Sequence, residues 1–573
     1  HYTATFMPPK GYPTTQFDMV VAEDVGLYKF DILSQRGLGK IKDAVADVNR
    51  NNPENLIDIH DLARFKQDEA VKDMLRNGKA IGCFYVESPA MRMLLSKLRV
   101  DDYLGLVAAS SIIRPGVAKS GMMREYIKRF RDPEERKKAH PIMMDIMPDT
   151  FGVMVYQEDV IKVAHYFAGL TLGEADVLRR RMSGKYRSRE EFEQAKEAFF
   201  RKALAKGHPA EMVEEVWRQT ESFAGYAFAK GHSASYAVES YQSLFLKAHY
   251  PLEYMVATLN NSGGFYRPEF YVHEARMHGG DIQAPCVNHS EAGAVVYGKV
   301  IYLGLASLKE LESKTVKWIC KARAEGGGFE SLVDFTERVP VGIEQITTLV
   351  KAGAFRFTGK NKKELMWESH LTLGKVKNRS IAPKLFSEGS KSFQFPAFYT
   401  APLEEAYDQI ELLGYPLCDP FLLLKRSPKG GILSVDMSDF VNQTVVAYGY
   451  LVTVKETKTA NDKRMQFGTF LDRKGFFLDT VHFPPVAAKY PFRGRGVYRI
   501  IGKVMEEFGF HCIEVSECYK EDMIEDPRYS EDRNVKKPER KNYREIEKAD
   551  ISTTNVNKNA RYFERKHKST VNE

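Results

Sequence analysis

The spacing of apolar and polar positions changes several times along this chain of 573 residues. Over residues 1–36 the two kinds alternate, as in the run at 16–21, which predicts strands and a turn. From about residue 37 to 290, apolar residues return every three or four positions, as at Met212 and Val216. That spacing predicts a long series of amphipathic helices.

The next two segments differ in texture. Residues 291–375 predict short helices, with breaks at Gly327 and Gly353 where the backbone needs freedom to turn. Residues 376–440 are rich in Ser, Pro, Lys and Gly, and they predict an irregular connector. The aromatic stripe that includes Phe199 in the preceding helical segment is interpreted as core rather than ligand surface.

Residues 441–520 are rich in β-branched and aromatic residues, separated by turn formers such as Asn461 and Gly475. This pattern predicts five short strands and an OB-fold, a small barrel that often binds single-stranded nucleic acid. A barrel that only packs against the helices is the alternative. Residues 521–573 mix both charges with few apolar residues, which predicts a disordered tail.

Composition narrows the class of protein. A mass of 65.3 kDa is too large for one ordinary core, and we expect two to four domains. Hydrophobic residues at 43% and charged residues at 28% are ordinary for soluble globular proteins, with no long apolar run. The 6 cysteines are scattered, without the paired spacing of zinc sites. Reduced thiols and a cytoplasmic location are therefore expected.

A net charge of +8 is mild for this length, but its distribution is uneven. Residues 124–138 and 178–189 concentrate Lys and Arg, as a surface that neutralises phosphates would require. A solvated helix face is the alternative interpretation of each segment.

A series of short blocks follows one order along the chain. They are TQFD at 15–18, YKFDIL at 28–33, RPG at 114–116, YQE at 156–158, FAG at 167–169, LRRR at 178–181, FAKGHSASYA at 228–237 and YQSLFLKAHYP at 241–251. In this order the blocks resemble the catalytic, or alpha, subunit of bacterial DNA polymerase III, a C-family DNA polymerase. The resemblance extends from about residue 12 to 520.

The resemblance implies a fold class: a mainly α-helical multidomain protein with a helix-hairpin-helix module, a C-terminal β OB-fold barrel and an N-terminal remnant of a palm sheet. The implied domains are the C-terminal piece of the palm at 1–36, α-helical fingers at 37–290, a helix-hairpin-helix module at 291–375, a connector and possible clamp-binding region at 376–440, the OB-fold at 441–520 and the tail at 521–573. Family members also carry a PHP domain and a palm Asp-x-Asp pair. Neither stands upstream of residue 31, so we expect a C-terminal fragment that is inactive alone and whose missing palm and PHP parts belong to the same polypeptide.

The implied activity is DNA-directed DNA polymerisation, in which a primer 3′-hydroxyl attacks a dNTP. Two Mg²⁺ ions hold the attacking and leaving oxygens of such a displacement. By resemblance Asp31 is a metal ligand and catalytic residue. Lys29 lies two residues earlier, so on a strand both side chains would share one face. A surface ion pair is the alternative for this pair.

The resemblance also assigns nucleotide-binding residues. Arg179 and Arg180 would bind the triphosphate, since guanidinium groups match phosphate oxygens. The block at 228–237 would frame the nascent base pair and its phosphates through Lys230, His232, Ser233 and Tyr236. An exposed basic helix and a structural helix start are the alternatives.

Primer-template DNA and its single-stranded template are the implied macromolecular partners. The predicted DNA-binding residues are Arg114, Lys119, Arg124, Lys128, Arg129, Lys463 and Arg464. At the first hairpin, where the family has glycines, this chain has Glu310 and Glu312, whose carboxylates would repel phosphate. That hairpin is therefore predicted to be degenerate.

A sliding clamp is a further possible partner. The peptide QFPAF at 394–398 resembles the family's clamp-binding peptide, but Ala397 replaces a larger apolar residue, which weakens the expected contact. Both the main replicase and the shorter error-prone type fit the sequence. A non-catalytic DNA-binding scaffold that retains fingers and OB-fold is the alternative from another class. Sequence patterns of P-loop ATPases, esterases and zinc proteases are absent.

Overall fold

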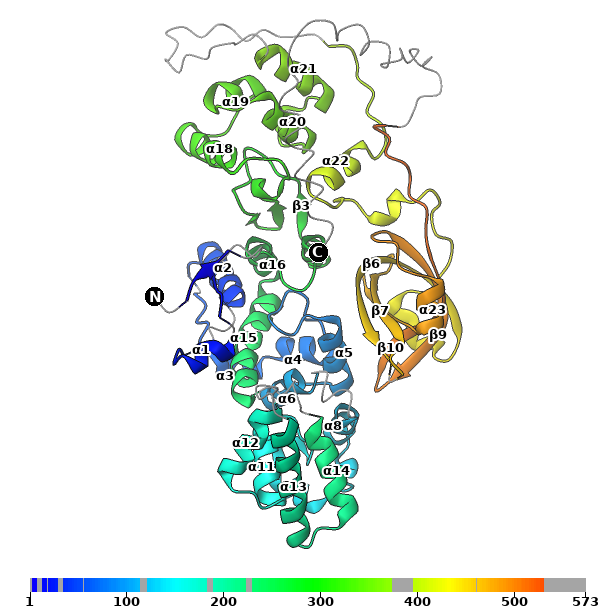
Figure 1. Ribbon diagram of the computed structural model, residues 1–573. Coiled ribbons are helices and arrows are strands. Elements are labelled where there is room, and N and C mark those ends of the chain that lie inside the picture. Colours follow the sequence, from blue (N-terminus) through cyan, green and yellow to red (C-terminus); the bar gives the residue numbers. More distant parts are fainter. Residues whose placement is uncertain are drawn as a thin grey trace, which may run out of the picture. The chain divides into compact units, whose positions relative to one another are not determined.

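The computed structural model describes residues 3–7, 13–17, 19–28, 35–54, 56–113, 121–182, 189–222, 229–373, 395–459 and 461–529 (Figure 1). The chain divides into two units, His1–Ile524 and Glu525–Glu573. The predicted tail lies outside the described residues from residue 530 onward. No helix in these ranges is long and apolar enough to cross a lipid bilayer.

At the N-terminus, strands β1 (Thr5–Phe6) and β2 (Thr14–Thr15) form a small antiparallel sheet. The alternation of residues 1–36 is thus reflected in a sheet. The predicted strand at 16–21 is wrong, because Met19–Asp24 forms helix α1. Short apolar runs such as Met19-Val20-Val21 do not distinguish a strand from a helix by spacing alone.

A series of helices follows, in blue to green in Figure 1. It comprises α2 (Gln35–Asn51), α3 (Leu62–Gln67), α4 (Glu69–Arg76), α5 (Pro89–Leu98), α6 (Tyr103–Ile112), α8 (Met122–Arg131), α9 (Pro133–Arg136), α10 (Pro141–Ile146), α11 (Gln157–Lys162), the π-helix η2 (Val163–Phe167), α12 (Leu172–Met182), α13 (Arg189–Ala205), α14 (Ala210–Glu221), α15 (Lys230–His249), α16 (Pro251–Asn260) and α17 (Pro268–Met277). The 3-10 turn η1 (Pro148–Thr150) precedes α11.

Local sequence sets where several of these helices begin. Asp68, Ser88 and Asp102 cap α4, α5 and α6 by accepting hydrogen bonds from backbone N–H groups of the first turn. Phe199 of the predicted aromatic stripe lies in the core, since it is fully buried and the centre of its ring lies 5.2 Å from that of Trp217. The helix caps and the buried aromatic contact stabilise the helical region.

Helix α15 is the central element of this region. It packs against α2, α3, α4, α6 and α16, and most of its second half is buried. Gly37 on α2 permits close approach, because a Cβ atom there would lie 1.9 Å from Glu239 Oε1 on α15. The second half of α15 is therefore packed closely against the neighbouring helices.

The next segment combines a small sheet with a second helical core. Its elements are β3 (Asp281–Gln283), β4 (Val295–Tyr297), β5 (Val300–Tyr302), the 3-10 turn η3 (Leu305–Ser307), α18 (Ser313–Gly326), α19 (Leu332–Arg338), α20 (Ile343–Lys351), the 3-10 turn η4 (Arg356–Thr358) and α21 (Lys362–Leu373). Both predicted breaks are confirmed, since Gly327 ends α18 with φ +74° and Gly353 follows α20 with φ +73°. The core of these helices includes Phe335, Leu349 and Phe355.

The connector is less irregular than the sequence predicts. Helix α22 (Glu404–Leu412) lies within residues 376–440, and the 3-10 turns η5 (Pro420–Leu423) and η6 (Ser434–Phe440) follow it. The prediction missed α22 because its stabilisation is tertiary. Leu412 packs in the second helical core, and Asp408 pairs with Lys362 of α21 at 3.1 Å.

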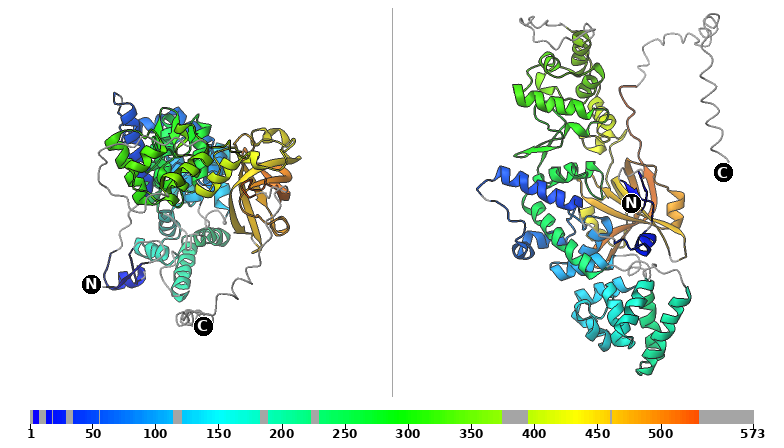
Figure 2. Two further views of the ribbon diagram at one scale, coloured as in Figure 1. Left: turned by 90° about the horizontal axis from the view of Figure 1, so that it is seen from above. Right: turned by 60° about the vertical axis from the view of Figure 1, so that its left-hand side comes forward.

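Residues 444–520 form a closed barrel in the order β10-β8-β7-β6-β9. Its elements are β6 (Thr444–Lys458), β7 (Arg464–Leu471), β8 (Phe477–His482), helix α23 (Pro484–Lys489), β9 (Val497–Glu507) and β10 (Phe510–Lys520). Figure 2 shows these strands in yellow and orange from two further sides. The barrel closes through parallel pairing of β8 with β10, while the other neighbours are antiparallel. This is the predicted OB-fold.

Particular residues, mostly glycines, permit the barrel's turns and the closest contacts between its strands. Asp462 and Gly475 adopt φ values of +58° and +85° at the turns that the sequence predicts. Gly502 on β9 is required sterically, because a Cβ atom there would lie 2.3 Å from the Glu514 carbonyl oxygen on β10. Phe470 and Ile500 are fully buried in the barrel interior.

Candidate nucleotide-binding site

Two predicted triphosphate-binding residues of helix α12, Arg179 and Arg180, pair with the same carboxylate. Arg179 donates to Asp176 Oδ1 from Nε at 3.0 Å and from Nη2 at 2.8 Å. Arg180 donates to Asp176 Oδ2 from Nε at 2.7 Å. The hydrogen bond from Arg179 holds the pKa of Asp176 below its usual range. Both guanidinium groups are thus oriented by a carboxylate one helical turn earlier.

The first turn of α11 lies beside this pair. Gln157 Oε1 accepts a hydrogen bond from Arg179 Nη1 at 3.3 Å. The turn is itself fixed by Asp159, which is 3% exposed and accepts from the backbone N–H groups of Val155 and Tyr156 at 2.9 Å each. Burial raises the pKa of Asp159. Gln157 therefore extends to Arg179 from a buried, hydrogen-bonded support.

The same turn contacts the start of α15. Both carboxylate oxygens of Glu158 accept from the Lys230 backbone N–H, at 3.1 and 3.0 Å. The Lys230 ammonium lies 5.2 Å from the centre of the Tyr156 ring and donates to Asp149 Oδ2 at 3.1 Å. A carboxylate at a helix N-terminus interacts favourably with the helix dipole. The first turn of α11 therefore contacts both Arg179 of α12 and the first residue of α15.

The remaining predicted residues of α15 differ in their surroundings. Ser233 is fully buried, and its Oγ lies 2.6 Å from Ser111 Oγ, so its hydroxyl faces the interior. The Tyr236 ring is half-buried against Tyr85, with ring centres 4.7 Å apart. His232, also half-buried, lies in the first turn of the helix.

Sequence reasoning did not assign roles to Asp149, Gln157, Glu158 or Asp176. A detectable pattern existed for Asp176, because it stands three and four residues before the two arginines, at the spacing of helical ion pairs. No local pattern links Glu158 with Lys230, which lies 72 residues away.

The predicted DNA-binding cations are partly engaged in other contacts. Lys128 donates to Glu125 at 2.8 Å, and Arg129, whose side chain is 16% exposed, donates to the Phe151 carbonyl at 2.9 Å. Arg124 is exposed. Arg129 therefore contributes to the packing of helix α8.

On the barrel, Lys463 and Arg464 lie at the exposed turn and start of β7. Arg464 pairs there with Glu456 of β6. An exposed ion pair of this kind contributes little stability.

Four further predicted residues, Lys29, Asp31, Arg114 and Lys119, lie outside the described residues. Among the residues that the structure does describe, no group of three or more His, Cys, Asp or Glu side chains could hold a metal ion.

The loop before α18 contains the predicted degenerate hairpin. Glu310 and Glu312 are both exposed, and Glu310 has φ +68°. Gln345 of α20 joins them, donating to the Glu310 carbonyl at 3.0 Å and accepting from the Glu312 N–H at 2.8 Å. Two carboxylates thus occupy a loop that is anchored to the second helical core.

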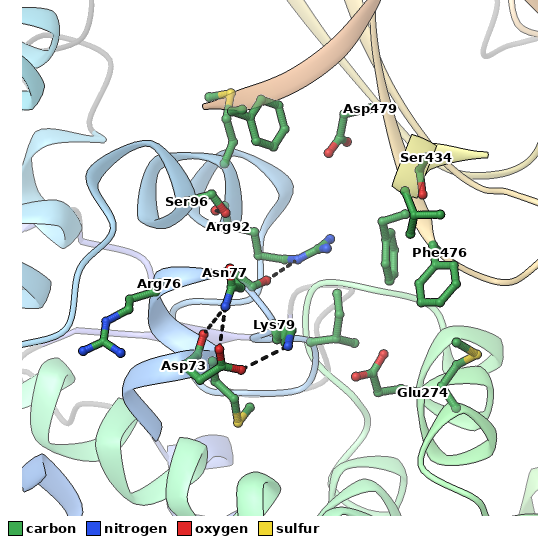
Figure 3. Close-up of a pocket in the computed structure, with 18 of the residues that line it drawn as sticks. Asp73, Arg76, Asn77, Lys79, Arg92, Ser96, Glu274, Ser434, Phe476 and Asp479 are labelled. Carbon is green, nitrogen blue, oxygen red and sulfur yellow. Dashed lines mark hydrogen bonds and ion pairs between the residues drawn. The ribbon is translucent and has the colours of Figure 1, made fainter. Parts of the chain in front are cut away.

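A separate cavity of about 710 Å³ is lined by α4, α5 and α17 and by residues of the barrel (Figure 3). Arg92 donates to the Gly78 carbonyl at 3.0 Å, and its guanidinium lies 4.2 Å from the centre of the Phe477 ring. Ion pairs already neutralise three other lining cations: Arg76–Asp101 at 3.0 Å, Lys79–Asp73 at 3.0 Å and Lys247–Glu274 at 2.7 Å. None of the predicted site residues within the described ranges lines this cavity.

Comparison with known proteins gives two family matches. Residues 37–207 match the family described as the bacterial DNA polymerase III alpha subunit finger domain. Residues 279–365 match the helix-hairpin-helix motif. The first match includes α11 and α12, and the second includes the Glu310 loop.

Curated relatives match over longer stretches. The chain is 32% identical to DNA polymerase III subunit alpha of Aquifex aeolicus over 486 residues, which are 83% of this chain and 40% of that protein. The subunit of the same name from Treponema pallidum is 31% identical over 495 residues, 83% of this chain and 42% of the relative. Error-prone DNA polymerase of Symbiobacterium thermophilum is 33% identical over 392 residues, 64% of this chain and 35% of the relative. The chain spans less than half the length of these relatives.

Proposed function

Because this chain belongs to the family of bacterial DNA polymerase III alpha subunits, we propose that it forms part of a DNA-directed DNA polymerase. It would take part in adding dNTPs to a primer 3′-hydroxyl, in replication or in mutagenic repair synthesis. The names of its relatives include both DNA polymerase III subunit alpha and error-prone DNA polymerase. Residues 1–36 would belong to the palm, 37–290 to the fingers, 291–375 to the hairpin module and 441–520 to a nucleic-acid-binding barrel.

The contacts of α11 with both helices that carry the predicted cations support this proposal most directly. Arg179 and Arg180 from α12 and Lys230 from α15 are each paired with an Asp carboxylate, Asp176 or Asp149. A carboxylate and a phosphate oxygen are both anionic acceptors, and guanidinium groups bind either. A dNTP triphosphate would bind these cations in place of, or together with, the carboxylates.

Two Mg²⁺ ions would supply the Lewis-acid chemistry of phosphoryl transfer when bound. Asp31 remains the proposed ligand by resemblance, and both it and Lys29, two residues earlier in the sequence, lie outside the described residues. The residues described here contribute substrate binding: the arginines and Lys230 would orient the triphosphate, and the Tyr236 ring would frame the base pair.

DNA would be held by elements beyond the nucleotide site. The helix-hairpin-helix match at 279–365 and the barrel turn with Lys463 and Arg464 support contacts with phosphates. A sliding clamp would bind the peptide at 394–398, of which Gln394 lies outside the described residues while the Phe395 and Phe398 rings lie 6.4 Å apart.

Kinetics with single dNTPs test the nucleotide assignment. In an active polymerase that contains this chain, Arg179→Ala should raise the KM for all four dNTPs by a similar factor of about tenfold, the order expected for a charged hydrogen bond to substrate. Affinity for primer-template DNA should change little. A KM effect confined to one base, or a large loss of DNA affinity with unchanged KM, would place Arg179 on the template path instead. If no purified form of the protein that contains this chain extends a primer, the alternative of a non-catalytic DNA-binding scaffold would be favoured.

A further inference from the structure

Two adjacent side chains at the first turn of α11 point to different elements of the proposed nucleotide site. Gln157 accepts from Arg179 Nη1 on α12 at 3.3 Å. Glu158 accepts from the Lys230 backbone N–H, the first residue of α15, at 3.1 and 3.0 Å. One short turn therefore connects both helices that provide the cations.

We propose that Gln157 and Glu158 are positioning residues, which set the distance and orientation between the Arg179 guanidinium and the start of α15. The proposal rests on the function proposed above, in which Arg179 and Lys230 bind the triphosphate. Neither residue is assigned a contact with substrate.

The Arg179 side chain has several rotatable bonds, and its position determines where a phosphate oxygen can bind. Asp176 fixes the Nε and Nη2 side of the guanidinium, at 3.0 and 2.8 Å. Gln157 fixes the Nη1 side, so the plane of the group is defined by contacts from two elements. Holding a binding group in its productive geometry reduces the entropy lost when substrate binds.

Glu158 acts on the backbone rather than on a side chain. Its carboxylate binds a free N–H at the start of α15, where the helix dipole favours an anion. That contact fixes the first turn of α15 against α11, with the Lys230 ammonium beside the buried Tyr156 ring. The support beneath both residues is rigid, because the buried Asp159 carboxylate accepts two backbone hydrogen bonds from the same turn.

A double-mutant cycle tests whether Gln157 acts through Arg179. In an active polymerase that contains this chain, Gln157→Ala should raise the KM for all four dNTPs about fivefold, the order expected when one hydrogen bond to a charged group is lost. The kcat and the affinity for primer-template should stay within about twofold. Gln157→Ala combined with Arg179→Ala should be no worse than Arg179→Ala alone, because coupled residues are not additive.

Two variants make the cycle specific. Gln157→Glu retains an acceptor oxygen and should restore most of the wild-type KM. Gln219→Ala is the matched control, since Gln219 is a glutamine on α14 that donates to Glu215 at 2.8 Å, and it should leave every KM unchanged. Thermal melting of each variant checks that the fold is retained.

Glu158 is tested by the same measurements. Glu158→Ala should raise the KM for all dNTPs and show the same non-additivity with Lys230→Ala, while Glu158→Gln, which keeps one acceptor oxygen, should lie between wild type and Glu158→Ala. Fully additive effects, or equal effects of Gln219→Ala, would overturn the positioning role. If Arg179→Ala and Lys230→Ala leave every KM unchanged, the proposed function itself fails. If they raise KM but Gln157→Ala and Glu158→Ala do not, only the present inference fails.

Discussion

Asp176 determines the geometry of two cations at once. Its two carboxylate oxygens accept from different arginines, Arg179 and Arg180, and the hydrogen bond from Arg179 keeps its pKa below the usual range. The carboxylate therefore stays ionised at neutral pH, and the arginines stay paired before substrate arrives. A triphosphate that binds there must compete with, or share, this carboxylate.

At the residue scale, Ser233 provides a clear stability test. Ser233→Ala removes one partner of the buried Ser111–Ser233 contact, and the stranded Ser111 hydroxyl should lower the free energy of unfolding by about 1 to 3 kcal/mol. Urea denaturation measures this loss. The double variant with Ser111→Ala should recover part of the stability, because neither hydroxyl is then left without a partner.

The same variants examine the nucleotide assignment of Ser233. Its hydroxyl faces the interior, at 0% exposure, so Ser233→Ala should leave the KM for dNTPs unchanged. A raised KM with unaltered stability would instead show that the Ser233 hydroxyl reaches the nucleotide.

At the scale of elements, the loop before α18 combines backbone strain with carboxylates that would repel DNA phosphates. Glu310 adopts φ +68°, a conformation that costs a non-glycine residue roughly 1 kcal/mol. Glu310→Gly should therefore stabilise the protein by about 1 kcal/mol relative to Glu310→Ala, which retains the strain. Differential scanning calorimetry of the two variants measures the difference.

These two variants also report on DNA. Both remove a carboxylate from the exposed loop, so both should strengthen binding to duplex DNA to a similar extent, and adding Glu312→Gly should strengthen it further. Unchanged duplex affinity in all of them would mean that this loop does not approach DNA.

The barrel contains a histidine whose titration should affect stability. His482 is fully buried, with Nε2 2.9 Å from Thr480 Oγ1, and burial lowers its pKa from 6.5 to about 4. The unfolded chain binds a proton near pH 6.5 while the folded barrel does not. The stabilising contribution is thus complete above pH 6.5 and is lost as the pH falls toward 4.

The pH dependence can be separated from other groups by comparison. Between pH 7 and 4, wild type should lose on the order of 3 kcal/mol more stability than His482→Asn, which does not titrate. Equal slopes for wild type and His482→Asn would show that the buried imidazole is protonated in the folded barrel.

At the scale of the whole molecule, binding of single-stranded DNA should depend on the sum of its phosphate contacts. Lys463→Ala with Arg464→Ala should weaken binding without changing sequence preference, and should reduce the slope of log affinity against log salt by about 0.7 for each lost contact. Fluorescence anisotropy at several salt concentrations measures the slope. Lys206→Ala, on the helical region, should leave it unchanged, and an unaltered slope in the double variant would exclude the barrel turn from the DNA path.

Local chemistry made much of the fold predictable. Side-chain spacing identified the helical region and the barrel strands, and turn formers such as Asp462, Gly475 and Gly353 stand where the backbone has positive φ. These features depend on interactions between residues that are close in sequence. The prediction of a strand at 16–21 was wrong because it also depended on local spacing alone. A short apolar run such as that of α1 fits either a strand or a helix.

The sequence by itself determined the family resemblance, the main elements and the identity of the cations in the proposed site. Only the tertiary structure decided which carboxylates hold those cations, that Ser233 is buried and that α22 forms. Glu158 and Lys230 are 72 residues apart, and β8 meets β10 in parallel only when the barrel closes. Such contacts depend on how whole helices and strands pack, and residue spacing along the chain does not specify that packing.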